Sequence, residues 1–372
     1  MQQRLADWLR LLVAHDTSVP PGDTGPLCRD LAPRLAALGY RVSLHEASPG
    51  LVSLVAVLGA GGPQLAFNAH ADTVGVDDLA AWHSNPFELA QTDDRLAGLG
   101  AVNCKGSLAA QLVVAEDVAR RGGPVRGSLS FSVVADEEQL GSSGTGLLRR
   151  DGIVRPDYLV VGAPTGNGIS SAERGVMWVA IETTGIAAHA GVPETGDSAI
   201  LRMLRILNRL QTELAPRLAV RTSPQGQATM NIGRIRGGEN TNVVPAFCRV
   251  EIDRRLTPSE NVAEAVEEIR ACLEDHATLE LLVGSSGFIA PADGALVREL
   301  TAAVRHVTGR APAFPSAVGA SDGRHYADDG IEIVTFGPGD GSLGHAANEW
   351  VSLHELAEAA MIQLDLVNRL LK

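Results

Sequence analysis

Hydrophobic residues recur along the first part of the chain at helical spacing and in short strand-like runs. Leu5, Trp8, Leu9 and Leu12 follow the spacing of one helix face, as do the leucines at 27, 31 and 35. Apolar runs typical of buried strands and a further helical pattern at 106–120 come after them. Strands that alternate with helices predict an α/β domain with a mostly parallel sheet and helices on both faces. The apolar runs cover 52–58, 65–68, 128–135 and 158–161.

The pattern changes near Glu173. Strands are expected at 176–183, 229–235, 247–255 and 278–283, and helices at 197–214 and 260–273. This β-α-β-β-α-β order is that of a ferredoxin-like α+β module. Helical spacing returns at 293–307, a strand is expected at 331–336, and a closing helix is expected at 353–371. Ser352 and Glu355 would form a capping box at the start of this closing helix. We therefore expect a discontinuous catalytic α/β domain of residues 1–173 and 285–372, with residues 174–284 inserted into it.

Composition and charge narrow the range of partners. The chain has 372 residues, of which 45% are hydrophobic and 20% charged, so it can build a sizeable core. Its formal net charge of −13 argues against nucleic acid and anionic membranes as partners. Four widely spaced cysteines, no basic-then-apolar leader and no long apolar window predict a cytoplasmic protein without a disulfide framework.

Polar side chains that could take part in catalysis or metal binding follow the expected strands. His70 and Asp72 are two residues apart, which places them on one side of an extended segment. A carboxylate beside an imidazole is the arrangement that orients a metal-ligating histidine. Three adjacent acids, 136–138, end a buried strand, where they are costly without a cation or an opening to solvent. A tight turn at 98–106 enters a helix, and a His-containing segment at 344–350 precedes the closing helix.

These four clusters, in their order and spacing, resemble the dinuclear-zinc metallopeptidase family of aminoacylase, acetylornithine deacetylase, succinyl-diaminopimelate desuccinylase and carboxypeptidase G. The resemblance extends over nearly the whole chain. It implies the two-domain fold described above, with the inserted domain as a lid and dimerisation domain and the molecule as a homodimer. Further matching positions are Trp82, Gly141, Gly144, Pro193, Asp253, Arg255, Ser321, Asp322 and the segments 162–165, 173–175, 185–189 and 241–245.

The resemblance implies a metal centre at the carboxyl edge of the sheet. In this family, two zinc or cobalt ions lie there. His70 and residue 163 correspond to the ligands of one ion, and Glu138 and His345 to those of the other. A carboxylate at position 103 bridges the two ions.

The resemblance also assigns roles in catalysis and substrate binding. Glu137 corresponds to the general base, and Asp72 to the residue that orients His70. His189 corresponds to the group that polarises the scissile carbonyl, often across a dimer interface. The contacts of the substrate carboxylate correspond to Asn242 and Arg255, and alternation along the strand is taken to leave the adjacent Arg254 exposed.

Two ligand positions depart from the family pattern. Residue 103 is Asn instead of Asp, and residue 163 is Ala, which cannot ligate a metal. Two dications about 4 Å apart repel by roughly 16 kcal/mol at an effective dielectric near 20. Of the three carboxylates that offset this repulsion in the family, only Glu138 is present. We therefore expect at most one zinc or other divalent ion per chain, with none as the alternative.

Three functions follow from these residues. The first is an amidohydrolase that acts on a small, carboxylate-bearing N-acyl or aminoacyl amino acid with an impaired centre. The second is a non-hydrolytic, metal-independent enzyme in which Glu137 deprotonates a substrate amine for lactam formation or acyl transfer. The third is a non-catalytic binding homologue, which would not require Glu137, Asp72 and His189 together.

Overall fold

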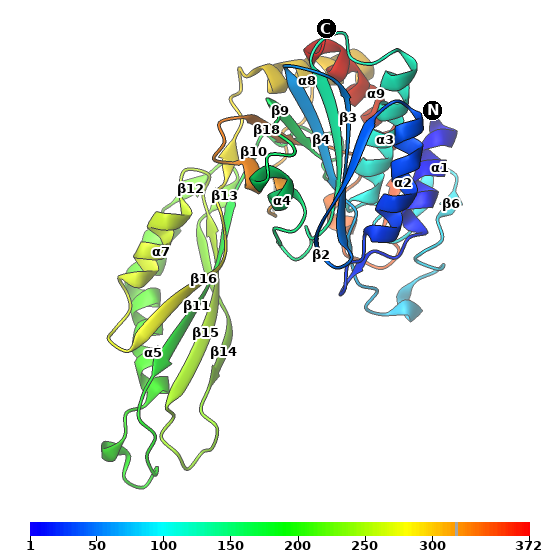
Figure 1. The fold of residues 1–372 in the computed structure, drawn as a ribbon. Coiled ribbons are helices and arrows are strands. Elements are labelled where there is room, and N and C mark those ends of the chain that lie inside the picture. The colour runs from blue at the N-terminus through cyan, green and yellow to red at the C-terminus, as the bar shows by residue number, and fades with distance from the viewer. Residues whose placement is uncertain (317–318) are drawn as a thin grey trace. The chain divides into compact units, whose positions relative to one another are not determined.

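The computed structural model describes residues 1–316 and 319–372, which form two compact units (Figure 1). Unit 1 comprises residues 1–171, 290–315 and 321–372. Unit 2 comprises residues 172–289 together with 316, 319 and 320. Each unit has its own hydrophobic core.

Unit 1 is built on a six-stranded sheet in the order β18-β9-β4-β8-β3-β2. The three pairs β18–β9, β9–β4 and β4–β8 are parallel, while β3 and β2 are antiparallel additions at one edge. The sheet is therefore mostly parallel, as the sequence predicts. Its strands are β2 (Arg41–Ser48), β3 (Leu51–Gly59), β4 (Gln64–His70), β8 (Ser128–Val134), β9 (Tyr158–Val161) and β18 (Glu332–Thr335).

The two faces of this sheet are covered differently. Leu65, Phe67 and Ala69 of β4 join the main core, which the long helices complete. Asn68 points to the opposite face, where its amide donates to Thr145 of α4 at 2.8 Å. Alternation along β4 thus gives one apolar face and one face with polar side chains. The helices are α1 (Gln2–Val13), α2 (Gly25–Ala37), α3 (Lys105–Arg120), α4 (Thr145–Arg150), α8 (Ala295–Thr308) and α9 (Leu353–Leu370).

The closing helix α9 begins with half of the predicted capping box. The Ser352 hydroxyl accepts a hydrogen bond from the Glu355 amide at 3.1 Å. The Glu355 carboxylate instead accepts from the Gly339 amide at 3.1 Å. Small strands complete unit 1: β1 (Ser18–Val19) pairs with β5 (Thr73–Val74), and β6 (Ala90–Thr92), β7 (Arg95–Ala97) and β19 (Trp350–Ser352) form a three-stranded sheet.

Unit 2 contains an antiparallel sheet in the order β14-β15-β11-β16, crossed by helices in the predicted β-α-β-β-α-β sequence. Apolar residues of β11, α5, β15 and α7 form its core. The main elements are β11 (Gly175–Thr184), α5 (Ala199–Arg209), α6 (Ala215–Ala219), β14 (Thr229–Gly237), β15 (Phe247–Leu256), α7 (Val262–Arg270) and β16 (Ala277–Ser285). The short strands are β10 (Ala172–Glu173), β12 (Thr222–Ser223), β13 (Gly226–Gln227) and β17 (Phe288–Ile289).

The expectation that Arg254 is exposed is wrong. Arg254 has the same parity on β15 as Val250 and Ile252, so it points into the covered face and is completely buried. Its guanidinium donates to Glu260 at 2.9 Å and Glu268 at 2.6 Å, which compensates the buried charge.

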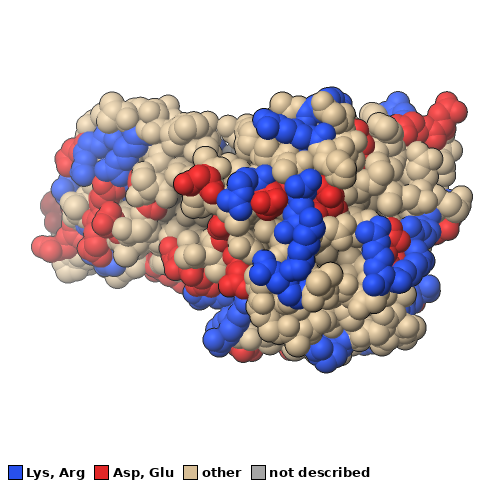
Figure 2. Space-filling view, turned by 90° about the horizontal axis from the view of Figure 1, so that it is seen from above, with Lys and Arg blue, Asp and Glu red and all other residues tan. Residues whose placement is uncertain are grey.

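The negative net charge is not gathered in one place on the face displayed in Figure 2, where acidic and basic side chains alternate over short distances. Within the part of the chain that the structure describes, no helix has the length and apolar character needed to cross a bilayer. All four cysteines are buried with free thiols.

Candidate active site

Three parallel strands of unit 1 end beside one another, and the residues after them gather the predicted chemistry. His70 is the last residue of β4 and is in register with Val134, the last residue of β8. Glu137 and Glu138 follow β8, and Ala163 follows β9, the other neighbour of β4. Because parallel strands share a carboxyl edge, these side chains converge at the place where ligands bind in such sheets.

His70 is buried and held from its own loop. Its Nδ1 lies 2.9 Å from the main-chain carbonyl oxygen of Asp72 and 3.7 Å from the Asp72 carboxylate. The backbone contact favours a proton on Nδ1, which leaves Nε2 free to face the cluster. Asp72 was predicted to orient His70; its carbonyl makes the closer contact, while its carboxylate accepts from the Glu138 amide at 3.0 Å.

The three adjacent acids point in different directions. Asp136 has a positive φ of 68° and its carboxylate accepts from the Ser143 amide at 3.0 Å. A Cβ at Gly141 would lie 1.8 Å from Asp136 Oδ2, so a side chain there would displace the Asp136 carboxylate. Glu137 Oε2 lies 3.7 Å from His70 Nε2, and one ligand atom each from His70, Glu137 and Glu138 lie within 4.8 Å of one another.

Asn103 and His345 reach the same cluster from two other segments. Asn103 Nδ2 lies 2.9 Å from Glu138 Oε1 and 3.1 Å from His345 Nε2, and the last two atoms are 3.0 Å apart. The amide therefore presents its nitrogen to the carboxylate. Residue 163 brings only a methyl group, half-buried after β9.

Burial and neighbouring charges shift the protonation of the cluster. Burial raises the pKa of Glu137 to about 8, despite the opposing charge of His70. Burial alone would lower the pKa of His70, but the negative charge of Glu137 leaves it well above its ordinary value. Burial disfavours ionised Glu138, yet hydrogen bonds from His345 and Asn103 and the charge of His70 lower its pKa. Hydrogen bonds and positive charge thus outweigh burial at Glu138, whereas burial prevails at Glu137.

A further buried cation was not predicted. The side chain of Arg324 is 1% exposed, and its Nη1 lies 3.9 Å from Glu137 Oε1 and 3.5 Å from Asp322 Oδ1. Its Nη2 donates to the Gly141 carbonyl at 3.1 Å. The only sequence signal was its position two residues after Asp322, which had been matched to the family pattern.

The remaining predicted residues lie in unit 2. His189 and Asn242 are neighbours there, because Ala190 N donates to the Asn242 carbonyl at 3.0 Å and His189 bridges to Val243. Both side chains are exposed. Arg255 lies at the other end of β15, roughly 27 Å along the strand from Phe247, and its Nε donates to Asp253 at 2.9 Å. One chain therefore cannot bring Asn242 and Arg255 to the same carboxylate.

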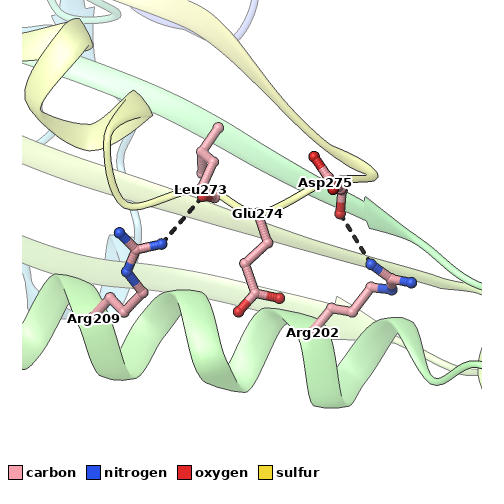
Figure 3. Close-up of a pocket in the computed structure, with 5 residues that line it drawn as sticks. All are labelled: Arg202, Arg209, Leu273, Glu274 and Asp275. Atoms are coloured by element: carbon pink, nitrogen blue, oxygen red, sulfur yellow. Dashed lines mark hydrogen bonds between the residues drawn. The ribbon is translucent and has the colours of Figure 1, made fainter.

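An open depression on unit 2 contains none of these residues (Figure 3). It is lined by Arg202, Arg209, Leu273, Glu274 and Asp275. Arg209 donates to the carbonyls of Ala271 and Leu273, and Arg202 to that of Asp275. These arginines satisfy carbonyls that follow the end of α7, which is a structural role.

Residues 66–369 match the model of peptidase family M20/M25/M40, and the chain belongs to this family. It is 30% identical over 374 residues to the succinyl-diaminopimelate desuccinylase of Thiobacillus denitrificans, covering 95% of this chain and 92% of that one. These findings confirm the resemblance and place the chain in a family of metallopeptidases and deacylases.

Solved structures agree on the fold. An M20 family metallo-carboxypeptidase from Sulfolobus solfataricus has a TM-score of 0.80 at 15% identity, with 99% of each chain covered. A tripeptidase from Staphylococcus aureus has a TM-score of 0.78 at 24% identity, with 99% of this chain and 98% of that one covered. At these identities the likeness establishes the architecture alone, a mostly parallel α/β sheet with an antiparallel inserted sheet.

Proposed function

We propose that the chain is an amidohydrolase-type enzyme with Glu137 as general base and a centre that takes at most one divalent ion. Its substrate would be a small N-acyl or aminoacyl amino acid. The observation that carries the proposal is the convergence of His70, Glu137 and Glu138, with ligand atoms within 4.8 Å, at the carboxyl edge of the sheet. Family membership supplies the reaction class, the cleavage of amide bonds in peptides and acyl amino acids.

The donor set fits one ion and does not fit two. Glu138 and His345, whose ligand atoms lie 3.0 Å apart, would supply one carboxylate and one imidazole, and a third protein ligand would complete the ligand number of a catalytic zinc that keeps an open position. Asn103 would contribute only if its amide presented the oxygen, and Ala163 offers no donor. When bound, one divalent ion would polarise a carbonyl oxygen and acidify water.

The chain's own residues perform the proton transfers and the positioning. Glu137 would take a proton from the attacking water and return it to the leaving amine. The Asp72 carbonyl fixes the Nδ1-protonated form of His70, so that Nε2 faces the centre. Arg324 places a fixed positive charge beside Glu137, which favours its ionised form.

One observation favours the second candidate, a metal-independent enzyme that forms or transfers amide bonds. The amide nitrogen of Asn103 lies within hydrogen-bond distance of both Glu138 and His345, where this donor competes with a cation for the same two side chains. Without an ion to generate hydroxide, Glu137 would remove a proton from a substrate amine that then attacks an acyl carbon. The leaving group of that acyl carbon departs with a proton, so the reaction remains balanced without a metal.

We also propose that the chain forms a homodimer through unit 2. Unit 2 exposes large apolar side chains on α5, on the edge strand β14 and at the start of the neighbouring strand β15, and the outer edge of β14 has no strand partner among the described residues. In addition, Asn242 and Arg255 lie too far apart in one chain to bind one substrate together. A substrate carboxylate that uses both would draw them from two chains. The exposed apolar residues are Leu201, Leu204, Ile235 and Phe247.

The test is an assay of purified protein with N-succinyl and N-acetyl amino acids and dipeptides, with and without a chelator and with added Co²⁺. The proposal expects release of the free amino acid, lost on chelation and restored by one equivalent of Co²⁺. Amide formation from an amino-acid substrate that is insensitive to the chelator would instead support the second candidate.

A further inference from the structure

Glu349 is a buried carboxylate whose partners are backbone amides. The residue is 3% exposed, and its two carboxylate oxygens accept hydrogen bonds from main-chain amides. Burying a carboxylate is costly unless hydrogen bonds compensate the loss of water. The Glu349 carboxylate must therefore be stabilised by hydrogen bonds from neighbouring groups of the protein.

Three amides of one loop converge on this carboxylate. Oε1 accepts from Gly100 N at 2.6 Å, and Oε2 accepts from Val102 N at 3.0 Å and from Asn103 N at 3.4 Å. The Glu349 carbonyl also accepts from Gly98 N at 3.2 Å. Backbone amides that converge in this way form an anion-binding concavity, and here a side chain of the same protein fills it.

The loop conformation depends on glycine at its centre. Gly100 has a φ of 77°, and a Cβ there would lie 2.6 Å from Thr73 Cγ2. The loop then continues through Asn103 into α3. The position of the Asn103 side chain is thus set by a backbone turn that Glu349 closes.

Glu349 also belongs to the segment that carries His345. On its other side, Asn348 accepts from His83 N at 2.7 Å and donates to the Ala81 carbonyl at 2.8 Å. The segment 345–349 is therefore fixed to two separate loops. The Glu349 bonds join it to the backbone of the loop that carries Asn103, whose side-chain amide also lies 3.1 Å from His345 Nε2.

We propose that Glu349 is a positioning residue that sets the separation between Asn103 and His345, and thereby the spacing of both around Glu138. It acts through the backbone of the 98–103 loop and does not itself touch the reacting atoms. The consequence for ion binding rests on the single-ion centre proposed above. The consequence for the geometry of Asn103 is independent of any ion.

Glu349→Gln is the principal variant. It preserves the shape but replaces one acceptor oxygen with an NH₂ group, which would face an amide N–H. Glu332→Gln is a matched control, because the Glu332 carboxylate also accepts two backbone amides, Ala295 N at 3.0 Å and Leu296 N at 2.8 Å, far along the chain from the loop. Asn348→Ala is a second control that loosens the same segment from its other partner.

The first measurement is a titration with Co²⁺ followed by visible absorption. Glu349→Gln should bind Co²⁺ about 10–100-fold more weakly than wild type, as expected when a ligand's support is removed. Glu332→Gln and Asn348→Ala should keep the wild-type affinity even where their melting temperatures fall. Glu349→Asp, which keeps the charge but shortens the reach, provides a second folded variant with the same expected loss. Wild-type affinity in both Glu349 variants would overturn the proposal.

The second measurement is a pair of crystal structures of metal-free wild type and Glu349→Gln. The Asn103 amide should leave Glu138 and His345 in the variant, and its retention would overturn the positioning role. If wild type binds no Co²⁺, the single-ion centre fails, and these two structures judge the role of Glu349 separately.

Discussion

Asn103 Nδ2 lies 2.9 Å from Oε1 of Glu138, so an amide donor faces the carboxylate at the centre of the site. An aspartate at this position would present oxygens, which repel the carboxylate until a cation lies between them. The amide removes that repulsion and with it the electrostatic need for a second ion. Ala163 also disfavours a second ion, because its methyl group offers no metal ligand.

Glu137→Gln should lower turnover by about 10²–10⁴-fold with little change in substrate binding, because it keeps the shape of the side chain and removes its basicity. Steady-state kinetics that separate kcat from KM provide the measurement. Asp136→Asn is the matched control, since the adjacent Asp136 carboxylate binds the Ser143 amide. Full activity in Glu137→Gln would defeat both catalytic candidates, because each of them requires this base.

His189→Ala should reduce kcat, because the resemblance makes His189 the group that polarises the scissile carbonyl. If His189 acts on the partner's site, a mixture of His189→Ala and Glu137→Gln chains should regain activity that neither variant has alone. Light scattering should show a dimer. A strict monomer would contradict the shared site.

Glu268→Gln should destabilise unit 2 in a pH-dependent manner. Burial opposes ionisation of Glu268, but hydrogen bonds from Arg221 and Arg254 outweigh it and lower its pKa to about 2. A depressed folded-state pKa contributes stability above the unfolded-state pKa near 4.5, and this contribution is lost as the pH falls toward 2. Removal of the Glu268 charge should lower the free energy of unfolding by about 1–3 kcal/mol at neutral pH.

Chemical denaturation of wild type and Glu268→Gln between pH 7 and the acid limit of the native state tests this expectation. The difference in the free energy of unfolding should be constant above the unfolded-state pKa and shrink below it. Exposed Glu267 is a suitable control position, since its partner Arg270 is 52% exposed and such pairs contribute little. A difference that stays constant down to the lowest pH would contradict the assigned ion pairs.

Asn103→Asp combined with Ala163→Glu should restore the missing ligands and raise metal loading to two ions per chain. In a hydrolase that has merely lost metal affinity, hydrolysis should rise with loading. In a metal-independent enzyme, the added cations should occupy the reaction site and suppress the native reaction. Each single substitution serves as control, because neither completes the ligand set of a second ion.

The strand ends could be predicted because the apolar runs and their order fix a parallel sheet, and a parallel sheet gathers its carboxyl ends. His70, Glu137 and Glu138 follow directly from that rule. β2 was not predicted, since this edge strand is mostly exposed and polar and carries no apolar run. Arg254 was misassigned because the alternation was counted from Arg255 alone, although Val250 and Ile252, on the same face as Arg254, are apolar and buried.

The role of Glu349 could not be read from the sequence. Its bonds to Gly100 and Asn103 join residues about 250 positions apart, and neither periodicity nor spacing encodes such a pairing. Arg324 is a similar case, since its contact with Glu137 depends on how the short 3-10 helix Asp322–Tyr326 is placed against the segment that follows β8. Local patterns predict elements and their ends, whereas the packing of loops against one another depends on the whole fold.

The most direct test of the central claim is the number of metal ions per chain in wild-type protein saturated with Zn²⁺ or Co²⁺ and freed of excess. Elemental analysis against protein concentration gives this number, and a crystal structure of the same sample locates the ions. We predict one ion or none per chain, with any ion beside Glu138. Two ions at full occupancy, about 3.5–4 Å apart, would contradict it.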